Sequence, residues 1–305
     1  MFGPSLSEME DSGRTLTLSL ARETLSTICD HESCRVLDVG CGEGRFLRDL
    51  LHQRPGVSAV GVDPYGLDRE SDGIRFLRLG AERLDGMLER FDLLVTSMSL
   101  HHFPDVASFL RAAWFVTRWQ SGRLLIVDWK QGVDTGIPEA YFSIDGVCER
   151  LDSSGWSLEL RLEDRWHFAI LARPRRFRFA VALGDDDVVA RGMLGTAPRF
   201  ALFDCTGSRI EQVELRDNPY VQTRQHRKTL DVARFLSDAS LLVASRIGPR
   251  GQDRLRARGI RMLLTGRPVP LPDLVGFLSA DLESGASFAE TGVFGGLGDV
   301  DLRFL

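Results

Sequence analysis

Two aspartates and three glycines form the group of residues that points most clearly to chemistry. Gly40, Gly42 and Gly44 alternate with other residues in a turn that follows a short apolar run, and Asp38 lies within that run. Because glycine has no Cβ, such a turn lets a ligand approach peptide N–H groups closely, which favours a nucleotide-type cofactor. Asp63 ends the next apolar run, and a carboxylate at a strand tip can accept hydrogen bonds from ribose hydroxyls. The pattern predicts a cofactor site.

A pair of histidines, His101 and His102, forms the second group. They follow an apolar run that ends at Ser97, and each carries an imidazole that can exchange a proton near neutral pH. Either could act as a general base if a bound substrate must lose a proton before it reacts. Paired histidines also suggest a metal. However, adjacent side chains on an extended backbone point apart, and no third ligand stands at a recognisable spacing, so we expect no metal here.

A parallel sheet would bring these two groups together. Short apolar runs with the composition of buried strands occur at 36–39, 57–62, 74–79, 91–97 and 123–129. Helical spacing of apolar residues fills several of the segments between them, and strands that alternate with helices predict a parallel sheet covered on both faces. Ligands of such sheets bind beyond the carboxyl ends of the strands. The glycine turn, Asp63, the histidine pair and the strand end 128–130 should therefore surround one crevice.

The spacing of the glycines distinguishes between cofactors. A dinucleotide fingerprint needs a third glycine where this chain has Arg45. The glycine turn, the two acidic strand ends and the segment Leu-His-His-Phe instead resemble class I S-adenosylmethionine-dependent methyltransferases, over residues 30–173. The resemblance implies an α/β, Rossmann-like domain, a small-molecule methyl acceptor and His101 and His102 as candidate catalytic residues. It implies cofactor contacts from Asp38, Gly40, Cys41, Gly42, Gly44, Asp63, Pro64, Ala81, Glu82 and Ser97.

One departure from that family lies after the third strand. The family usually has Asp-Ala there, and the acid contacts the adenine amino group, whereas this chain reads Leu79-Gly80-Ala81-Glu82. Ala81 still offers its backbone, and Glu82 is the candidate that would replace the acid. The alternative for Glu82 is a surface carboxylate that begins a helix, where acidic residues are favoured.

Composition narrows the class of protein. The chain has 305 residues, is 43% hydrophobic and carries a formal net charge of −5. No uncharged apolar run reaches the roughly 18 residues of a membrane span, and an acidic N-terminal stretch that includes Glu8 and Glu10 is not a secretory signal. The five cysteines are scattered and lack a C-x-x-C pair. This pattern predicts reduced thiols, no zinc site or disulfide frame, and a cytoplasmic location.

The chain changes character at the Pro/Arg-rich segment 172–176. Acidic residues outnumber basic ones before it, and basic residues outnumber acidic ones from 175 to 284. Such a reversal predicts a domain boundary. Because the positive charge is modest and spread out, it does not favour nucleic-acid binding. The sequence thus divides into a helical lead-in, the methyltransferase-like domain, a second domain and a flexible Gly-rich tail, at 1–29, 30–173, 177–284 and 285–305.

The second domain has an α/β pattern of its own. Strand runs are expected at 177–183, 199–205, 209–215, 239–245 and 260–264, with helices at 226–236, 249–258 and 271–282. This order resembles the dinitrogenase iron–molybdenum cofactor biosynthesis family, a ribonuclease-H-like module that carries metal–sulfur clusters. Met193 and Ser245 stand where that family commonly has stronger ligands, which leaves only His226 and Cys205 as strong ligands. We therefore expect no cluster.

Two interpretations follow. The favoured one is S-adenosylmethionine-dependent methyl transfer to a small-molecule acceptor. The alternative is a non-catalytic adaptor or a metallocluster-carrier-like protein, in which the first domain only binds the cofactor and the second domain binds a metallocluster or a protein partner. The intact glycine turn and the two aspartates favour binding of the cofactor, whereas the acceptor cannot be inferred from these residues.

Overall fold

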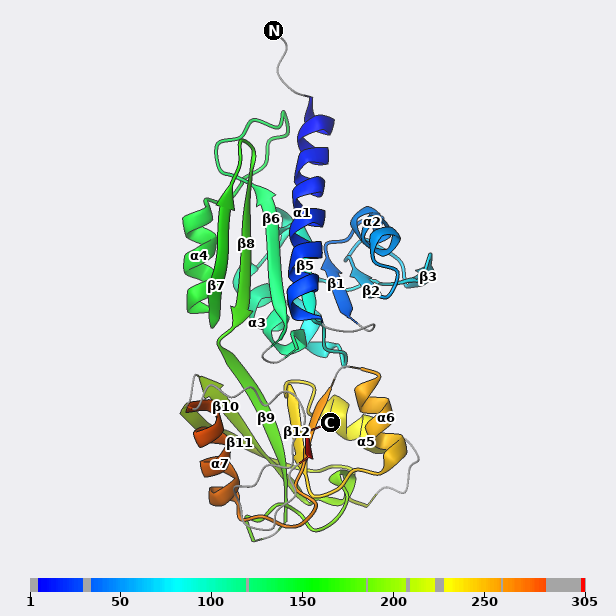
Figure 1. Ribbon diagram of the computed structural model, residues 1–305, viewed down its shortest axis with the longest axis vertical. Helices are drawn as coiled ribbons and strands as arrows, with labels where there is room; N and C mark the ends of the chain where they lie inside the picture. The colour runs from blue at the N-terminus through cyan, green and yellow to red at the C-terminus, as the bar shows by residue number, and fades with distance from the viewer. Residues whose placement is uncertain are drawn as a thin grey trace. The chain divides into compact units, whose positions relative to one another are not determined.

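The computed structural model describes residues 5–29, 34–118, 121–184, 186–206, 209–222, 228–258, 260–283 and 303–304 (Figure 1). The chain forms two compact units. The first comprises Met1–Asp85 and Phe91–Pro174, and the second comprises Gly86–Arg90 and Arg175–Leu305. None of the helices in the described ranges is long and apolar enough to cross a membrane.

An eight-stranded sheet in the order β3-β4-β2-β1-β5-β6-β8-β7 forms the centre of the first unit. Its parallel strands are β1 (Arg35–Val39), β2 (Ser58–Val62), β4 (Ile74–Leu77), β5 (Leu93–Ser97) and β6 (Arg123–Trp129). Antiparallel strands extend it at both edges, namely β3 (Arg69–Ser71), β7 (Trp156–Glu163) and β8 (His167–Pro174). The Rossmann-like α/β fold expected from the sequence is confirmed.

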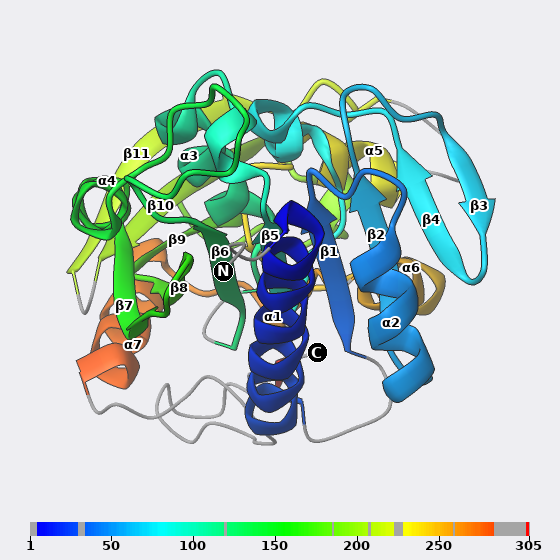
Figure 2. The ribbon, with the colours of Figure 1, turned by 90° about the horizontal axis from the view of Figure 1, so that it is seen from above.

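Helices cover both faces of this sheet: α1 (Leu6–Ile28) and α2 (Arg45–Gln53) on one face, and α3 (Val106–Val116) and α4 (Ile144–Ser153) on the other (Figure 2). On the first face, Leu25 of α1 and Leu47 of α2 pack against Val36 and Val95 of the central strands. Burying such side chains contributes about 1.5–3 kcal/mol each. This packing fixes the turn between β1 and α2 on a rigid base.

The beginning of α1 is set by a capping box. The Ser5 side chain accepts a hydrogen bond from the Glu8 N–H at 3.3 Å, and the Glu8 carboxylate accepts one from the Ser5 N–H at 2.7 Å. These two bonds satisfy donors that a helix start leaves unpaired, which stabilises the helix by about 1 kcal/mol. The capped end of α1 therefore holds its first turns in place.

A six-stranded sheet in the order β11-β10-β9-β12-β13-β14 forms the second unit. Its strands are β9 (Arg176–Leu183), β10 (Arg199–Thr206), β11 (Arg209–Asp217), β12 (Leu241–Ala244), β13 (Arg261–Leu264) and β14 (Arg303–Phe304). Strands β9 to β11 are antiparallel, whereas β12 is parallel to both β9 and β13. The helices are α5 (Lys228–Phe235), α6 (Pro249–Arg256) and α7 (Leu271–Glu283). The predicted α/β character of this domain is confirmed.

The segment Gly86–Arg90 belongs to the second unit, although the sequence places it inside the first domain. Leu88 joins the apolar core of that unit. Arg90 is 1% exposed, and its Nη2 donates to the carbonyls of Ser237 at 2.6 Å and Ala239 at 2.7 Å. A buried cation that pairs with fixed carbonyls is costly to remove, so these hydrogen bonds hold the segment Gly86–Arg90 within the second unit.

The structure corrects one sequence expectation and leaves a second one largely untested. The expectation of reduced thiols is wrong for Cys29 and Cys34, which form a disulfide because the end of α1 and the start of β1 bring their Cα atoms to 6.1 Å. The expected flexible tail at 285–305 lies mostly outside the described residues, but its residues Arg303–Phe304 form β14, which pairs with β13.

Candidate active site

The glycine turn between β1 and α2 has left-handed backbone geometry at all three glycines. The φ angles are +76° at Gly40, +50° at Gly42 and +80° at Gly44. A Cβ on Gly40 would lie 2.6 Å from Ser99 Cβ, and one on Gly44 would lie 2.6 Å from the Phe76 ring. A Cβ on Gly42 would meet nothing within 4 Å. Packing therefore requires two of the glycines, while the third leaves open space beside the backbone.

Asp63 follows β2 and holds this turn. Its carboxylate accepts hydrogen bonds from the Gly42 N–H at 3.0 Å and from the Tyr65 N–H at 2.9 Å. The Gly40 and Cys41 N–H groups both donate to the Val62 carbonyl, at 2.9 and 3.1 Å. The carboxylate predicted to contact a ribose thus lies at the strand tip beside the glycine turn, and it also orders the loop.

Asp38 is 3% exposed at the end of β1 and faces a cavity. Burial, and to a smaller extent the charge of Asp63, raise the pKa of Asp38 to about 7. A positively charged ligand group in the cavity would favour its ionised form. The thiol of Cys41 in the turn also has a pKa raised by burial, so it is a small packing residue and a poor nucleophile.

One cavity of about 450 Å³ holds the residues predicted to bind adenosine. Glu82 and Ala81 enter it from η1 (Ala81–Gly86). The Glu82 Oε1 atom is buried and has no hydrogen-bond partner. Because an unpaired buried polar oxygen costs free energy, this atom is an available acceptor for a ligand donor. The cavity is lined by Gly40, Asp63, Pro64, Tyr65, Gly80, Ala81, Glu82, Ser99, His102, Phe103 and Pro104.

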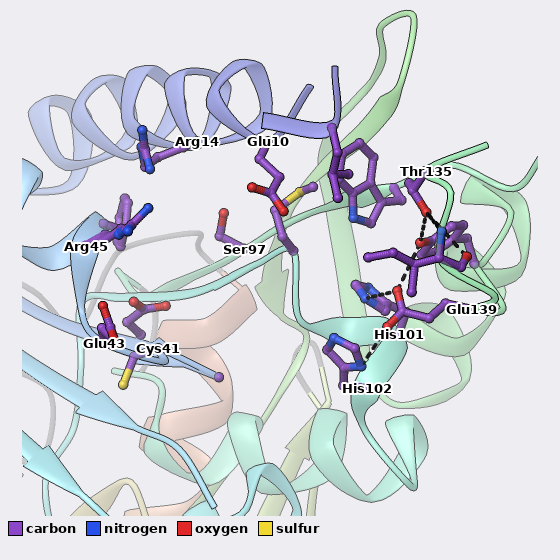
Figure 3. Close-up of a pocket in the computed structure, with 18 residues that line it drawn as sticks. Glu10, Arg14, Cys41, Glu43, Arg45, Ser97, His101, His102, Thr135 and Glu139 are labelled. Atoms are coloured by element: carbon purple, nitrogen blue, oxygen red, sulfur yellow. Dashed lines mark hydrogen bonds and ion pairs between the residues drawn. The ribbon is translucent and has the colours of Figure 1, made fainter. Parts of the chain in front are cut away.

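A second cavity of about 540 Å³ lies on the other side of the glycine turn, and Gly40 and His102 line both cavities. Figure 3 shows the turn residues on one side of it and the histidine pair with Glu139 on the other. The beginning of α1 contributes Glu10 and Arg14. Its aromatic and apolar wall consists of Leu6, Phe46, Met98, Trp129, Ile137 and Tyr141. Both cavities lie beside the carboxyl ends of the strands, since Gly40 follows β1 and lines both.

His101 lies in the short turn η2 (Leu100–His102), and its side chain is 3% exposed. Its Nδ1 is 2.7 Å from Asp128 Oδ1, and its backbone N–H donates to Asp128 Oδ2 at 3.0 Å. An ionised carboxylate only accepts hydrogen bonds, so Nδ1–H donates to Asp128. The Nε2 atom then faces Glu139, whose Oε2 is 3.4 Å away. Asp128 thus fixes the orientation of the imidazole.

His102 lies beside His101 rather than pointing away from it. The two ring centroids are 4.0 Å apart, and His102 Nδ1 is 3.9 Å from Glu139 Oε1. The expectation that the side chains diverge is wrong because the backbone here is a 3₁₀ turn and not extended. The third partner, Glu139, comes from the loop after β6, and its Oε2 accepts a hydrogen bond from the Tyr141 hydroxyl at 3.0 Å.

Other predicted residues serve the framework of the site. The Ser97 hydroxyl pairs with that of Thr17 in α1 at 2.8 Å, which ties the helix to the end of β5. Ser99, which the sequence did not single out, donates to the Gly40 carbonyl at 2.9 Å. Sequence reasoning also missed Glu10, Arg14 and Glu139. The strand end at 128–130 was the one sequence signal for this side of the larger cavity. It identified neither Glu139 nor the α1 residues Glu10 and Arg14.

The candidate cluster ligands of the second unit lie in different settings. Cys205 is buried in β10, and burial raises the pKa of its thiol. Ser245 is buried and donates to the Ala190 carbonyl at 2.5 Å, while Met193 is 48% exposed. His226 lies outside the described residues. Within the described part of the chain, the group of three side chains that could hold a metal ion is in the first unit.

Comparison with known families identifies both halves of the chain. A family described as "Methyltransferase domain" matches residues 11–173, and one described as "Dinitrogenase iron-molybdenum cofactor" matches residues 175–276. The chain therefore belongs to the methyltransferase domain family, and residues 175–276 match the dinitrogenase iron–molybdenum cofactor family. The resemblances expected from the sequence are confirmed.

Curated relatives match parts of the chain. A 2-ketoarginine methyltransferase of Streptomyces arginensis is 38% identical over 65 residues, which cover 21% of this chain and 19% of the relative. A demethylmenaquinone methyltransferase of Roseiflexus is 35% identical over 114 residues, covering 34% of this chain and 48% of the relative. The chain thus spans less than half the length of these relatives.

Solved structures resemble about half of the chain. An S-adenosylmethionine-dependent methyltransferase of Aquifex aeolicus has a TM-score of 0.42 at 18% identity and covers 56% of this chain and 98% of that one. A putative S-adenosylmethionine-dependent methyltransferase of Listeria monocytogenes has a TM-score of 0.41 at 11% identity, with 54% and 99% covered.

Proposed function

We propose that this protein transfers a methyl group from S-adenosylmethionine to a small-molecule acceptor. The observation that carries the proposal is the pair of cavities of about 450 and 540 Å³ that meet at the glycine turn. One has the polar groups that a nucleoside needs, and the other has an aromatic wall with a histidine pair. Both lie at the carboxyl edge of the sheet, where ligands of such folds bind.

The residues fit this cofactor. Asp63 can accept from the ribose hydroxyls, and the unpaired Glu82 Oε1 can accept from the adenine amino group. The open space beside Gly42 allows the cofactor to lie against the backbone. Asp38 offers a buried carboxylate to the positively charged methionine end. When bound, the cofactor supplies a methyl group on a good leaving group, so the transfer is an in-line displacement.

The protein's task is to orient the acceptor and to exclude water from the larger cavity. Trp129 and Tyr141 supply an apolar wall against which a small molecule can pack. His101, fixed by Asp128 and facing Glu139, lies where an acceptor hydroxyl could give up its proton. His102 borders both cavities, so it would lie between a cofactor bound in one and an acceptor bound in the other.

Calorimetric titration of the full chain with S-adenosylmethionine tests the cofactor site. The variant Asp63→Ala should bind the cofactor about 1.5–3 kcal/mol more weakly, as expected when hydrogen bonds to a charged group are lost. The matched control is Asp85→Ala, which removes an exposed carboxylate of η1. Equal affinities of the two folded variants would remove Asp63 from the site.

An acceptor screen with a radiolabelled methyl group then tests turnover. Transfer of label to a hydroxylated small molecule supports the methyltransferase, and the label should depend on Asp63. Tight cofactor binding without transfer to any small molecule would instead favour the adaptor interpretation. In that case the second unit, with its metallocluster-related family, would be the place to look for a protein or cluster partner.

A further inference from the structure

We propose that His101, His102 and Glu139 bind one divalent cation of the zinc type in the larger cavity, and that the methyl acceptor is a hydroxylated molecule that coordinates to it. The cation site stands on the geometry of these three residues. The statement about the acceptor rests on the proposed function.

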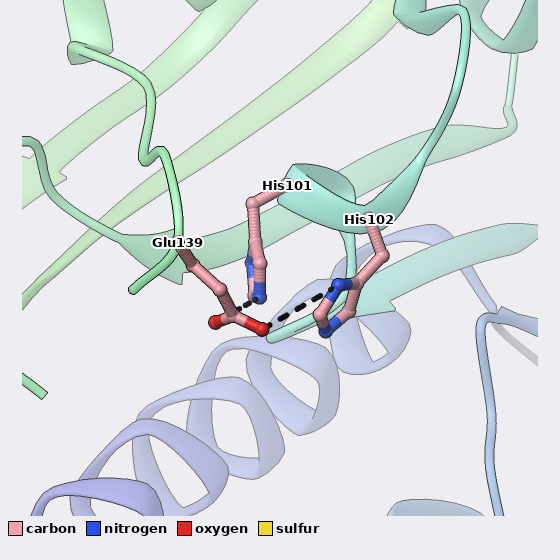
Figure 4. Close-up of side chains that lie close together, drawn as sticks. All are labelled: His101, His102 and Glu139. Carbon is pink, nitrogen blue, oxygen red and sulfur yellow. Dashed lines mark ion pairs between the residues drawn. The ribbon is translucent and has the colours of Figure 1, made fainter. Parts of the chain in front are cut away.

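The three side chains converge on one point. Figure 4 shows both imidazoles and the Glu139 carboxylate turned toward one another. One possible ligand atom from each residue lies within 4.8 Å of the others. Glu139 Oε2 is 3.4 Å from His101 Nε2, and Oε1 is 3.9 Å from His102 Nδ1. All three residues line the cavity of about 540 Å³, so a bound cation would be reached from it.

These separations suit ligands around a cation better than direct hydrogen bonds. The second distance, from His102 to Glu139, is too long for a hydrogen bond. Zinc binds imidazole nitrogen and carboxylate oxygen at about 2.0–2.2 Å, so two ligand atoms of a tetrahedral site lie about 3.4 Å apart. Small closing movements of the Glu139 side chain, which is 28% exposed, and of the His102 side chain, which is 60% exposed, would complete this geometry.

Supporting hydrogen bonds already orient two of the three ligands. His101 is bound through Nδ1 to Asp128, which is 1% exposed, so Nε2 is directed into the cavity. Histidines that bind metals almost always donate their other ring N–H to such a partner. Tyr141 donates to Glu139, and Thr135 pairs with the Tyr141 hydroxyl at 2.7 Å. The group therefore has the second layer of contacts that metal sites need.

The donor set indicates which cation and which chemistry. Two imidazoles and one carboxylate are the protein ligands of catalytic zinc sites, in which a fourth position stays open for water or substrate. An acceptor hydroxyl that occupies this position would lose its proton more readily to solvent as it binds, before water is excluded from the cavity, because a divalent cation stabilises the anion. An acceptor with a second oxygen next to the hydroxyl would chelate the cation, which defines the substrate class.

Zinc binding by the full chain, stripped of metal with a chelator, is the test. A chromogenic chelator competes for added Zn²⁺, and Co²⁺ in place of zinc gives visible absorption that reports the ligands directly. We expect one equivalent of Zn²⁺ per chain. His102→Ala and Glu139→Gln should each weaken binding by at least about 100-fold, more than the effect typical of second-layer partners. Acetohydroxamate, a chelating probe, should change the Co²⁺ absorption.

Matched controls and a second titration make the outcomes distinct. His52→Ala and Glu149→Gln remove an exposed imidazole and an exposed carboxylate elsewhere and should leave zinc affinity within about 2-fold. Absence of stoichiometric zinc, or zinc affinity unchanged in both site variants, overturns the inference. If such a protein still binds S-adenosylmethionine, the proposed function survives and His101 acts as a base. Zinc binding without any cofactor binding would support the cation site and refute the methyltransferase.

Discussion

Burial of Asp38 makes the free energy of unfolding of the cofactor-free protein depend on pH, and it sets both the sign and the size of this dependence. Its pKa is about 7 in the folded protein, against 3.8 for an ordinary aspartate. Between these pH values the folded protein keeps a proton that the unfolded chain has lost. The free energy of unfolding should therefore fall as the pH rises from about 4 to about 7 and then level off.

The magnitude is worked from the same two pKa values. Each pKa unit corresponds to about 1.4 kcal/mol, so holding Asp38 ionised in the folded protein costs up to ~4 kcal/mol above pH 7. Asn has nearly the shape of Asp without the charge. Asp38→Asn should therefore be more stable than the natural protein at about pH 8, by up to about 4 kcal/mol, and the difference should vanish near pH 4.

The cofactor should reverse this effect. Its positively charged end favours the ionised form of Asp38, so affinity for S-adenosylmethionine should rise as the pH rises toward about 7 and then level off. Asp38→Asn should bind the cofactor more weakly at about pH 8 and lose this pH dependence. The variant would thus be more stable when free and weaker in binding, a combination that a purely structural role for Asp38 does not produce.

Urea denaturation at about pH 5 and about pH 8, at constant ionic strength, measures the first effect, and calorimetry measures the second. Asp85→Asn, which neutralises an exposed carboxylate, is the control and should change neither quantity by more than about 0.5 kcal/mol. An Asp38→Asn protein that is equal to or less stable than the natural protein at about pH 8 would refute the reasoning. It would mean that Asp38 is solvated or paired in the folded state.

Four further predictions use other parts of the structure. Gly42→Ala should abolish cofactor binding, and its backbone strain should cost about 1–2 kcal/mol of stability. Gly40→Ala should destabilise the fold more, because its Cβ meets Ser99. Thermal unfolding measures the loss of stability, and calorimetry measures the loss of cofactor binding. Glu82→Ala should weaken S-adenosylmethionine but not its inosine analogue, which lacks the amino donor, as a competition assay can show. Arg90→Met should cost about 3 kcal/mol or more in urea denaturation, since it leaves buried carbonyls without their donor. Anaerobic reconstitution with iron and sulfide should yield no stable cluster absorption, because the second unit has too few strong ligands; a stable cluster would revive the carrier interpretation.

The cofactor side of the site could be predicted from the sequence because its signals are local. The glycine turn requires positive φ at Gly40 and Gly44, and both Asp38 and Asp63 sit at strand ends that short apolar runs already mark. In a parallel sheet these strand ends lie at the same edge, so their proximity can be predicted without knowing how the other segments fold. Even the departure at Glu82 could be noticed, because the order of strands fixed where an adenine contact should lie.

The acceptor side could not be predicted because its residues meet only through tertiary packing. His101 and His102 were visible, but their mutual approach depends on the 3₁₀ turn, which has no strong sequence pattern. Glu139 stands 37 residues after His102 in a loop without a motif, and the position of that loop depends on Tyr141 and Thr135. Similarly, nothing near Arg90 indicates that its partners follow about 150 residues later.

This difference between the two sides bears on how the protein could select its acceptor. The cavity proposed for the cofactor lies at the edge of the parallel sheet, where strand-end residues such as Gly40 and Asp63 line it. The acceptor cavity is lined by the glycine turn and strand ends, and also by three segments away from the cofactor cavity's strand ends: the beginning of α1, the turn η2 and the loop that carries Glu139. Changes in that loop would alter the acceptor, and any cation that positions it, while the cofactor site stays intact. Acceptor specificity should therefore be sought in residues 130–143, and exchanging this loop should change the acceptor without changing cofactor affinity.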